Sequence, residues 1–227
     1  MNRLAQFLQY TRKVFELKRL LRSVRDGRSD PAIPILSVSL CLVLGVVMRI
    51  ASYLDLAEQT KRRRWRRLCG LQGALSDDTF HYVTERMQPE DWRQNQAKVV
   101  KTLKGNKALE SCKIKGLLFV SLDANEHFQS RSRCCPSCCQ RPVEVIQADG
   151  QKHPVTEEYH RYVFAQLNGP KLNVLLDLEP IRPGEEECAA ALRLLGRLRR
   201  LHGPRFSDGI TADAWYAQGP FLRTAGS

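Results

Sequence analysis

The first half of the chain carries apolar residues at the spacing of amphipathic helices. Residues 2–24 place apolar side chains three and four positions apart with basic residues between them, the pattern of a helix with one buried face. Breakers at residues 26–31 end this helix, and an apolar segment then runs to about residue 56.

Two further helices are predicted by their start signals. Residues 76–79 (Ser-Asp-Asp-Thr) offer N-cap oxygens to a helix that runs through about Met87. Pro89, followed by two acids, is a favourable first turn for a helix that runs to about Lys107. We therefore expect residues 1–115 to be all-helical.

The periodicity changes after residue 115. Residues 117–122 form a β-prone run that ends at Asp123, and turn signals follow at Asp149-Gly150 and His153-Pro154. The next predicted strands are residues 161–167 and 172–178. Because Asn168-Gly169 between them is a strong hairpin turn, we expect these two strands to pair antiparallel.

A helix and a last strand complete the pattern. Pro183-Gly184 opens a helix with acids in its first turn and arginines in its last turns, as the helix dipole favours, and Gly203-Pro204 closes it. Residues 210–212 form a short strand that ends at Asp213. The predicted order is strand, strand, strand, helix, strand, so the whole chain is of the α+β class.

Charge separates the two halves. Residues 1–115 hold 23 Lys and Arg against 11 Asp and Glu, and the remainder is neutral, so the whole net charge of +12 lies in the first half. With 43% hydrophobic residues the chain is too apolar to be disordered. We expect a basic module at 1–115 that suits a polyanion such as nucleic acid, and a second module at 116–227 with a Cys-rich insertion at about 130–160.

One uncharged segment, residues 32–48, is close to the minimum length of a membrane span. Arginines lie on both sides of it, which gives no inside–outside bias. We interpret it as a buried helix with no membrane partner, and a membrane anchor stays as the alternative. Basic residues interrupt the first 21 positions, so no signal peptide is expected and a cytoplasmic, reducing location is predicted.

Asp123 and Asp213 are the candidate catalytic residues. Each follows a strand of buried character, where an acid either forms a turn or binds a cation. If the first and last strands are neighbours in a mixed sheet, the two carboxylates meet at one edge. Paired carboxylates hold Mg²⁺ or Mn²⁺, which in two-metal sites promote attack on a phosphodiester.

Four of the eight cysteines lie at positions 134, 135, 138 and 139. Cys135 and Cys138 form a Cys-x-x-Cys that can chelate one Zn²⁺, and His153 and His160 are candidates for the missing ligands. Reduced, partly exposed thiols are the alternative. The scattered Cys41, Cys69, Cys112 and Cys188 are expected to pack as small apolar groups.

A basic run supplies a candidate DNA contact. It places one tryptophan among six cations, which suits phosphate neutralisation with little sequence preference; a solvated helix face is the alternative. The run comprises Lys61, Arg62, Arg63, Arg64, Trp65, Arg66 and Arg67.

Several blocks of the second half resemble one family. Asp123-Ala-Asn-Glu-His-Phe-Gln-Ser130, followed by Cys135-Pro-Ser-Cys138, is similar to the first-aspartate block of the DDE transposases of bacterial insertion sequences. Thr211-Ala-Asp-Ala-Trp-Tyr216 resembles the second-aspartate block. Tyr159-His-Arg-Tyr162, Leu178-Glu-Pro-Ile181 and Glu187-Cys-Ala-Ala190 are also similar, as is the region around residues 76–80.

The resemblance implies a ribonuclease-H-like core that cuts and joins DNA at transposon ends, with Asp123 and Asp213 as ligands of Mg²⁺ or Mn²⁺. It favours His160 over His153 as the zinc ligand, and it implies double-stranded DNA and a homo-oligomer as partners. The family also has a third carboxylate further along, whereas the sequence ends fourteen residues after Asp213.

We therefore expect an incomplete core of order β-β-β-α-β in a C-terminally truncated copy that does not cleave DNA by itself. A catalytically dead DNA-binding remnant is the alternative function.

Overall fold

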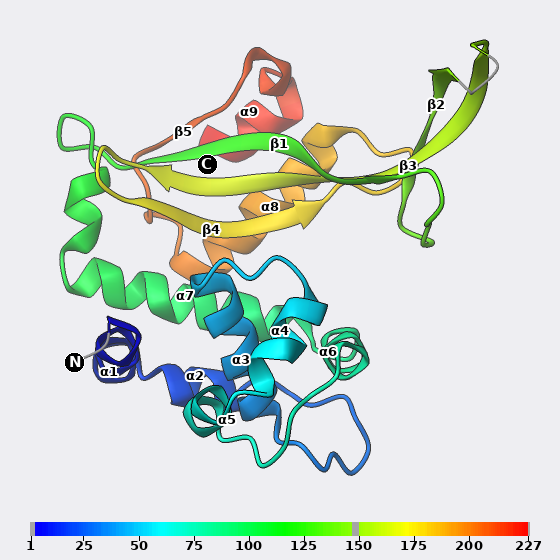
Figure 1. Cartoon of the computed structure of the whole chain (residues 1–227). Helices are drawn as coiled ribbons and strands as arrows, with labels where there is room; N and C mark the ends of the chain where they lie inside the picture. Colours follow the sequence, from blue (N-terminus) through cyan, green and yellow to red (C-terminus); the bar gives the residue numbers. More distant parts are fainter. Residues whose placement is uncertain (1–2, 147–149, 227) are drawn as a thin grey trace. The chain divides into compact units, whose positions relative to one another are not determined.

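The computed structural model describes residues 3–146 and 150–226. These residues form two compact units, Met1–Thr102 and Leu103–Ser227, and each unit is described by itself. The first unit is helical and the second contains a mixed sheet, so the chain is of the α+β class, as the sequence predicts (Figure 1).

The first unit consists of short helices. Their bounds are α1 Arg3–Phe15, α2 Leu17–Arg22, α3 Ile35–Val47, α4 Tyr53–Thr60, α5 Arg63–Cys69, α6 Asp77–Thr84 and α7 Pro89–Gly105, the last of which extends into the second unit. The prediction of one helix over residues 2–24 was wrong. Glu16 adopts a left-handed backbone with a φ of 50°, which interrupts the helix between α1 and α2.

The apolar segment folds into the centre of this unit. Helix α3 has 13 residues and buries side chains all round, including Val38, Cys41 and Leu44 at 0% exposure. These pack with Leu21, Leu56, Trp65, Phe80 and Val83 in one core. Among the described residues, no helix has both the length and the apolar character needed to cross a bilayer.

Predicted caps explain where two of the helices begin. The Ser76 hydroxyl accepts a hydrogen bond from the Thr79 N–H at 3.2 Å and starts α6. Pro89 is the first residue of α7, a position where its missing N–H costs nothing. Helix α6 ends at Thr84, earlier than the predicted Met87.

The second unit contains a five-stranded sheet. After the short 3₁₀ helix Ala108–Cys112 come β1 Phe119–Ser130, β2 Cys139–Ile146, β3 Lys152–Asn168, β4 Asn173–Pro180, helix α8 Glu187–His202, β5 Gly209–Thr211, the 3₁₀ helix Ala214–Tyr216 and α9 Gly219–Gly226. The long strand β3 pairs with β1 along one edge. Along its other edge it pairs first with β2 and then with β4.

Two pairings agree with the sequence analysis. Strands β3 and β4 form the predicted antiparallel hairpin around Asn168-Gly169. Strand β5 lies parallel to β1, so the first and last strands are neighbours. Helix α8 packs on the sheet through buried residues such as Ala190, Leu194 and Leu198, and in Figure 1 it lies against β3 and β4.

The strand count and two strand bounds were wrong. The structure has the order β-β-β-β-α-β, because residues predicted as a polar insertion form β2 and the first part of β3. Val143 pairs with Val155, and His153 and Pro154, predicted as a turn, lie inside β3. Asp149 of the other turn signal lies outside the described residues. The β2–β3 ribbon extends from the rest of the sheet in Figure 1.

Asp123 does not end its strand. Strand β1 continues to Ser130 because β3 pairs with it throughout, with Asp123 opposite Phe164. Only the parallel pairing with β5 stops early, at Ser121 opposite Thr211. Asp123 therefore lies just beyond the end of the β1–β5 ladder.

Candidate functional site

The two candidate catalytic aspartates occupy equivalent places on neighbouring parallel strands. Ser121 and Thr211 are paired residues of β1 and β5, and their hydroxyls are 2.8 Å apart. Asp123 and Asp213 each follow two residues later. Because alternate residues of a strand share a face, Asp123 lies on the same side of β1 as Ser121, whereas Asp213 lies two residues past the end of β5. Both aspartates are solvent-exposed.

Asp213 also has a local role. Its backbone is extended, with φ −72° and ψ 173°, and its carboxylate accepts a hydrogen bond from the Trp215 N–H at 3.0 Å. It therefore caps the 3₁₀ helix Ala214–Tyr216. This agrees with the alternative that Asp213 forms a turn. The second carboxylate oxygen is not used by this cap.

Tyr216, the last residue of the block that resembles the second-aspartate region, also lies here. Its side chain is 1% exposed, and its hydroxyl is close enough to the Glu187 carboxylate for a hydrogen-bond interaction. Burial raises the pKa of Tyr216, and the carboxylates of Glu187, Asp213 and Asp123 raise it further. From the sequence, Tyr216 was named only as the last residue of that block, and no role was assigned to it.

Glu187 supplies a third acid near Tyr216. It is the first residue of α8, and its carboxylate forms an ion pair with Arg161 of β3 at 2.7 Å. This ion pair holds Glu187 against Arg161. We therefore do not count Glu187 as a metal ligand together with the two aspartates. Among described residues, the only group of three or more potential metal ligands close together is in the cysteine-rich turn, not here.

That turn brings together Cys135, Cys138 and His160. Their sulfur and Nε2 atoms all lie within 4.8 Å of one another. Cys135 is exposed, Cys138 is buried at 7% exposure and His160 is half-buried. The sequence analysis named these three residues, and the structure places them side by side.

The remaining residues of the cysteine-rich run are placed differently. Cys139 is buried and directs its sulfur to the Ile181 carbonyl at 3.8 Å. Cys134 is exposed. His153 lies on the distal part of β3, opposite Val145, and is not in the group. The four scattered cysteines are all buried and unbridged, as predicted.

An ion cluster joins the three strands beside this turn. Arg141 of β2 makes a bidentate contact with Glu126 of β1, at 2.8 Å for each bond, and also contacts Glu157 of β3 at 2.5 Å. Hydrogen bonding by Arg141 lowers the pKa of Glu157. Since Glu157 is 6% exposed, its charge needs this partner, and we assign the cluster a structural role.

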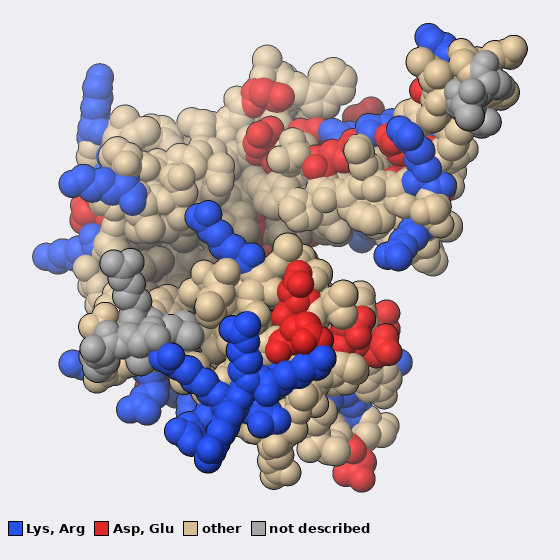
Figure 2. Space-filling model, in the orientation of Figure 1, with Lys and Arg blue, Asp and Glu red and all other residues tan. Residues whose placement is uncertain are grey.

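The basic run covers part of the first unit. Lys61 and Arg62 precede α5, and the rest of the run lies on this helix. In the run, the arginines at 62, 63, 64 and 67 are exposed, and Arg66 is half-buried. Within the described residues, none of these five arginines forms an ion pair; Lys61 pairs with Glu58. Figure 2 shows Lys and Arg side chains gathered over the place that α5 occupies in Figure 1.

Trp65 has a different role from the one suggested by its neighbours. It is 5% exposed and belongs to the core, as does Cys69 one turn later. Its indole is therefore not on the surface for stacking on a base. The run presents charge alone, on the face of α5 opposite its buried residues.

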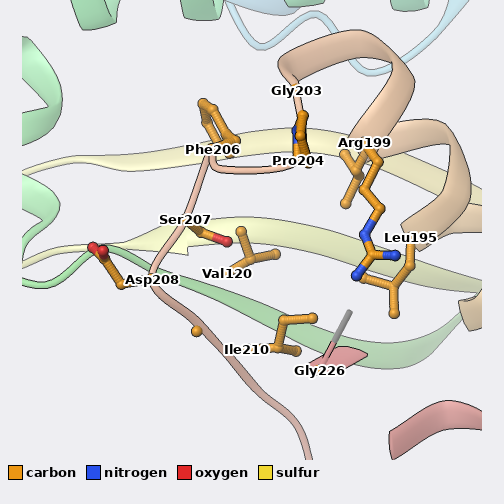
Figure 3. A pocket seen from close by; sticks show the side chains of 12 residues that line it. Val120, Leu195, Arg199, Gly203, Pro204, Phe206, Ser207, Asp208, Ile210 and Gly226 are labelled. Atoms are coloured by element: carbon orange, nitrogen blue, oxygen red, sulfur yellow. The ribbon is translucent and has the colours of Figure 1, made fainter. Parts of the chain in front are cut away.

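A cavity of about 220 Å³ lies between α8, β1 and the segment that leads into β5. Figure 3 shows Val120, Leu195 and Ile210 on its walls together with Arg199. Arg199 donates to the Thr224 carbonyl, and the Asp208 carboxylate accepts from the Leu118 N–H. Both charged groups are engaged by the fold, so neither of them is free to act on a ligand in this cavity.

No protein-family model, curated protein or solved structure matches this chain.

Proposed function

We propose that the chain is a transposase-type protein of the DDE class, which binds double-stranded DNA through its first unit and carries a ribonuclease-H-like core in its second. In this proposal the protein acts in the cytoplasm on transposon ends, as an oligomer, and the family activity is cutting and joining of DNA strands. The resemblance of the motif blocks suggested this function, and features of the fold support it.

The arrangement of strands is one support. If the β2 extension is set aside, β1, β3 and β4 form an antiparallel meander with β3 in the middle. Helix α8 then leads to β5, which lies parallel to β1 on the free edge. The resulting order, third-second-first-fourth, is the order of strands in a ribonuclease-H-like core.

The register of β1 against β5 is the observation that carries the proposal. Asp123 and Asp213, ninety residues apart in the sequence, both lie two positions beyond the pair Ser121–Thr211. Because the parallel ladder stops at this pair, both aspartates lie just past the same end of the ladder, and both lie close enough to Tyr216 to raise its pKa. The hydrogen bond between the two hydroxyls fixes this register at the last pair of the ladder.

Asp123 and Asp213 offer carboxylate oxygens, the ligand type that divalent cations such as Mg²⁺ prefer. Mg²⁺ is commonly held by one or two carboxylates and completes its shell with water and substrate phosphates. Asp123 and one oxygen of Asp213 are available for this purpose, and both carboxylates lie close enough to Tyr216 to raise its pKa. When bound, such an ion activates a hydroxyl nucleophile and stabilises the leaving oxygen of a phosphodiester.

A DNA-binding protein without strand cleavage is the second candidate. Strand cleavage by this class needs a third carboxylate. Within the described residues, no group of three or more potential ligands includes the two aspartates, and this favours a protein that binds DNA without cutting it. Glu187, which also lies near Tyr216, is paired with Arg161. In this alternative the chain occupies transposon ends without cutting them.

A nicking assay separates the two candidates. Supercoiled plasmid would be incubated with the chain and Mn²⁺, and conversion to the open circle measured for the parent, Asp123→Asn and Asp213→Asn. Any Mn²⁺-dependent nicking by the parent should fall at least about 100-fold with each substitution, because each removes a ligand charge from the cation.

The matched control is Asp55→Asn, at an exposed acid in the first turn of α4, which should nick at the parental rate. Nicking that persists in both aspartate variants would overturn the assigned site. Absence of nicking by the parent, with DNA binding intact, would select the second candidate.

A further inference from the structure

The group formed by Cys135, Cys138 and His160 has the dimensions of a metal site. The two sulfurs are 3.7 Å apart, and the His160 Nε2 lies 3.5 Å from the Cys135 sulfur and 3.4 Å from the Cys138 sulfur. With Zn–S bonds of about 2.3 Å and Zn–N bonds of about 2.0 Å, a tetrahedral site has edges of about 3.8 Å between sulfurs and about 3.5 Å between sulfur and nitrogen. All three measured edges agree with these values.

The backbone prepares this arrangement. Residues 135–138 form a turn closed by a hydrogen bond from the Cys138 N–H to the Cys135 carbonyl at 3.0 Å. The Cys135 N–H in turn donates to the Cys138 sulfur at 3.1 Å. Such an N–H group stabilises negative charge on the sulfur, as thiolate ligation requires.

The sheet supplies the third ligand at the right place. Cys139 pairs with Tyr159, so one more step of the β2–β3 register sets Cys138 opposite His160. Phe128 pairs with His160 from the other side, on β1, and the two rings lie 5.6 Å apart. The imidazole therefore lies beside the Phe128 ring, and its Nε2 faces the two sulfurs of the turn.

We propose that Cys135, Cys138 and His160 bind one Zn²⁺, with a water molecule as the fourth ligand. Two thiols release their protons to the solvent as they bind, the imidazole binds in its neutral form, and no oxidant is involved. Two sulfurs and one imidazole favour zinc over Mg²⁺ or Ca²⁺, which select oxygen. This site is separate in chemistry and residues from the carboxylate site, and it does not depend on the proposed function.

The fourth position faces a shallow pocket. This pocket, of about 190 Å³, is lined by the three ligands together with Phe128, Arg133 and Cys134. Cys135 is exposed on this side, so water can reach the ion. Cys134 is close in sequence, but its sulfur is not within the group of ligand atoms.

The ion would tie the β1–β2 connection to the middle of β3. Without it, the turn is held by few contacts, among them hydrogen bonds from the backbone N–H groups of Ser132 and Arg133 to the Ser130 hydroxyl, at 3.2 and 3.0 Å. With it, residues from a turn and a strand more than twenty positions apart are joined. We therefore expect zinc to protect the connection from local opening.

The first test measures stoichiometry and ligand identity. The full chain, purified in reducing buffer, is expected to hold one zinc per molecule by elemental analysis. Replacement with Co²⁺ is expected to give a tetrahedral visible spectrum with thiolate charge-transfer bands. Cys135→Ser, Cys138→Ser and His160→Ala should each lower zinc affinity more than about 100-fold, because even second-shell changes cost 10–100-fold.

Two neighbouring cysteines provide the matched controls. Cys134→Ser and Cys139→Ser change the same residue type one position away and should keep both the zinc content and the cobalt spectrum. Loss of zinc in Cys134→Ser would overturn the water-ligated site in favour of a third thiolate. Absence of zinc in the parent, or recovery of a Cys135–Cys138 disulfide in place of metal, would overturn the site altogether.

A second readout does not depend on the variants' overall stability. Trypsin cleaves after Arg131 and Arg133, which immediately precede the turn. At free zinc 100 times its Kd, cleavage there should slow about 100-fold relative to chelator-treated protein, because the ion binds only the closed turn. The Cys135→Ser variant should be cleaved equally fast with and without zinc, whereas Cys134→Ser should be protected like the parent.

Discussion

At the scale of single residues, Asp208 determines how β5 meets β1. Its carboxylate accepts a hydrogen bond from the Leu118 N–H at 2.7 Å, and its own N–H donates to the Leu118 carbonyl at 2.8 Å. These two bonds precede the first β1–β5 pair, Phe119 with Gly209. Asp208 is thus a positioning residue for Asp123 and Asp213, although it lies far from them along the strands.

We predict that Asp208→Ala lowers the free energy of unfolding of the second unit by about 2 kcal/mol, because a buried N–H loses a charged acceptor. Urea denaturation followed by circular dichroism would measure this. The control is Glu144→Ala, which removes an ion pair with Lys152 whose two side chains are each 66% exposed, and which should change stability by less than about 0.5 kcal/mol. An equal effect of both substitutions would contradict the assignment.

At the scale of elements, buried charges join α8 to β4. Arg197 contacts Asp177 and Glu179, each at 2.6 Å, and Arg193 contacts Glu179 at 2.8 Å. Asp177 and Glu179 are only 7% and 6% exposed, so their charges depend on these arginines. The cluster fixes the helix against the strand and, through the helix, the approach of the chain to β5.

Removing one partner from this cluster should be costly. We predict that Arg197→Met, which keeps most of the side chain's length, destabilises the second unit by about 3 kcal/mol at pH 7 because it leaves buried carboxylates short of a counter-charge. Arg200→Met is the control, at an exposed position of the same helix, and should cost less than about 0.5 kcal/mol.

The cost should also depend on pH. Burial alone would raise the pKa of Glu179, but Arg193 and Arg197 outweigh it and hold this pKa below its ordinary value of 4.5. A carboxylate with a lowered pKa stabilises the folded state above its unfolded pKa and loses that contribution as the pH falls through the folded value. The difference between parent and Arg197→Met should therefore shrink below about pH 4.5. The same difference at pH 7 and pH 3 would contradict this.

At the scale of the whole molecule, the basic run and the candidate metal sites lie in different units of the chain. The basic run lies on α5 of the first unit, whereas both candidate metal sites lie in the second. Arg63 and Arg67 are four residues apart and exposed, so they share a face of α5. Trp65 and Cys69 share the buried face, which leaves the cations directed to solvent.

We predict that the chain binds double-stranded DNA with an affinity that falls steeply with salt, and that Arg63→Gln with Arg67→Gln reduces the slope of log K against log salt by about 2, near 0.9 for each lost phosphate contact. Fluorescence anisotropy with labelled duplexes would measure it. Arg86→Gln is the control, because that arginine is already paired with Glu85 and stacked on Tyr82. An unchanged slope in the double variant would remove α5 from the DNA interface.

Local sequence signals determined much of the fold. The Ser76 cap, Pro89 at the start of α7, the Asn168-Gly169 hairpin and the helix that ends before Gly203 were all predicted, because each depends on residues close together in the chain. The residues of the cysteine group were also named from spacing and resemblance. These features need only short-range physical chemistry.

Tertiary structure decided what local signals could not. The left-handed Glu16, the strand β2, the length of β3 and the burial of Trp65 all depend on what a segment meets elsewhere in the fold. Residues 139–146 became a strand because β3 pairs with them, and Asp123 lies inside β1 because β3 continues past it.

The same distinction applies to the sites. The sequence supplied the ligand types, but only the β1–β5 pairing set Asp123 and Asp213 two positions beyond one residue pair. Only the β2–β3 pairing brought the His160 Nε2 within 3.4 Å of the Cys138 sulfur. The sequence analysis assigned no role to Tyr216, whose burial arises from the packing around it. Side-chain chemistry is a property of each residue, whereas proximity between distant residues exists only after the strands have paired, and this is why the tertiary structure was needed to assemble the sites.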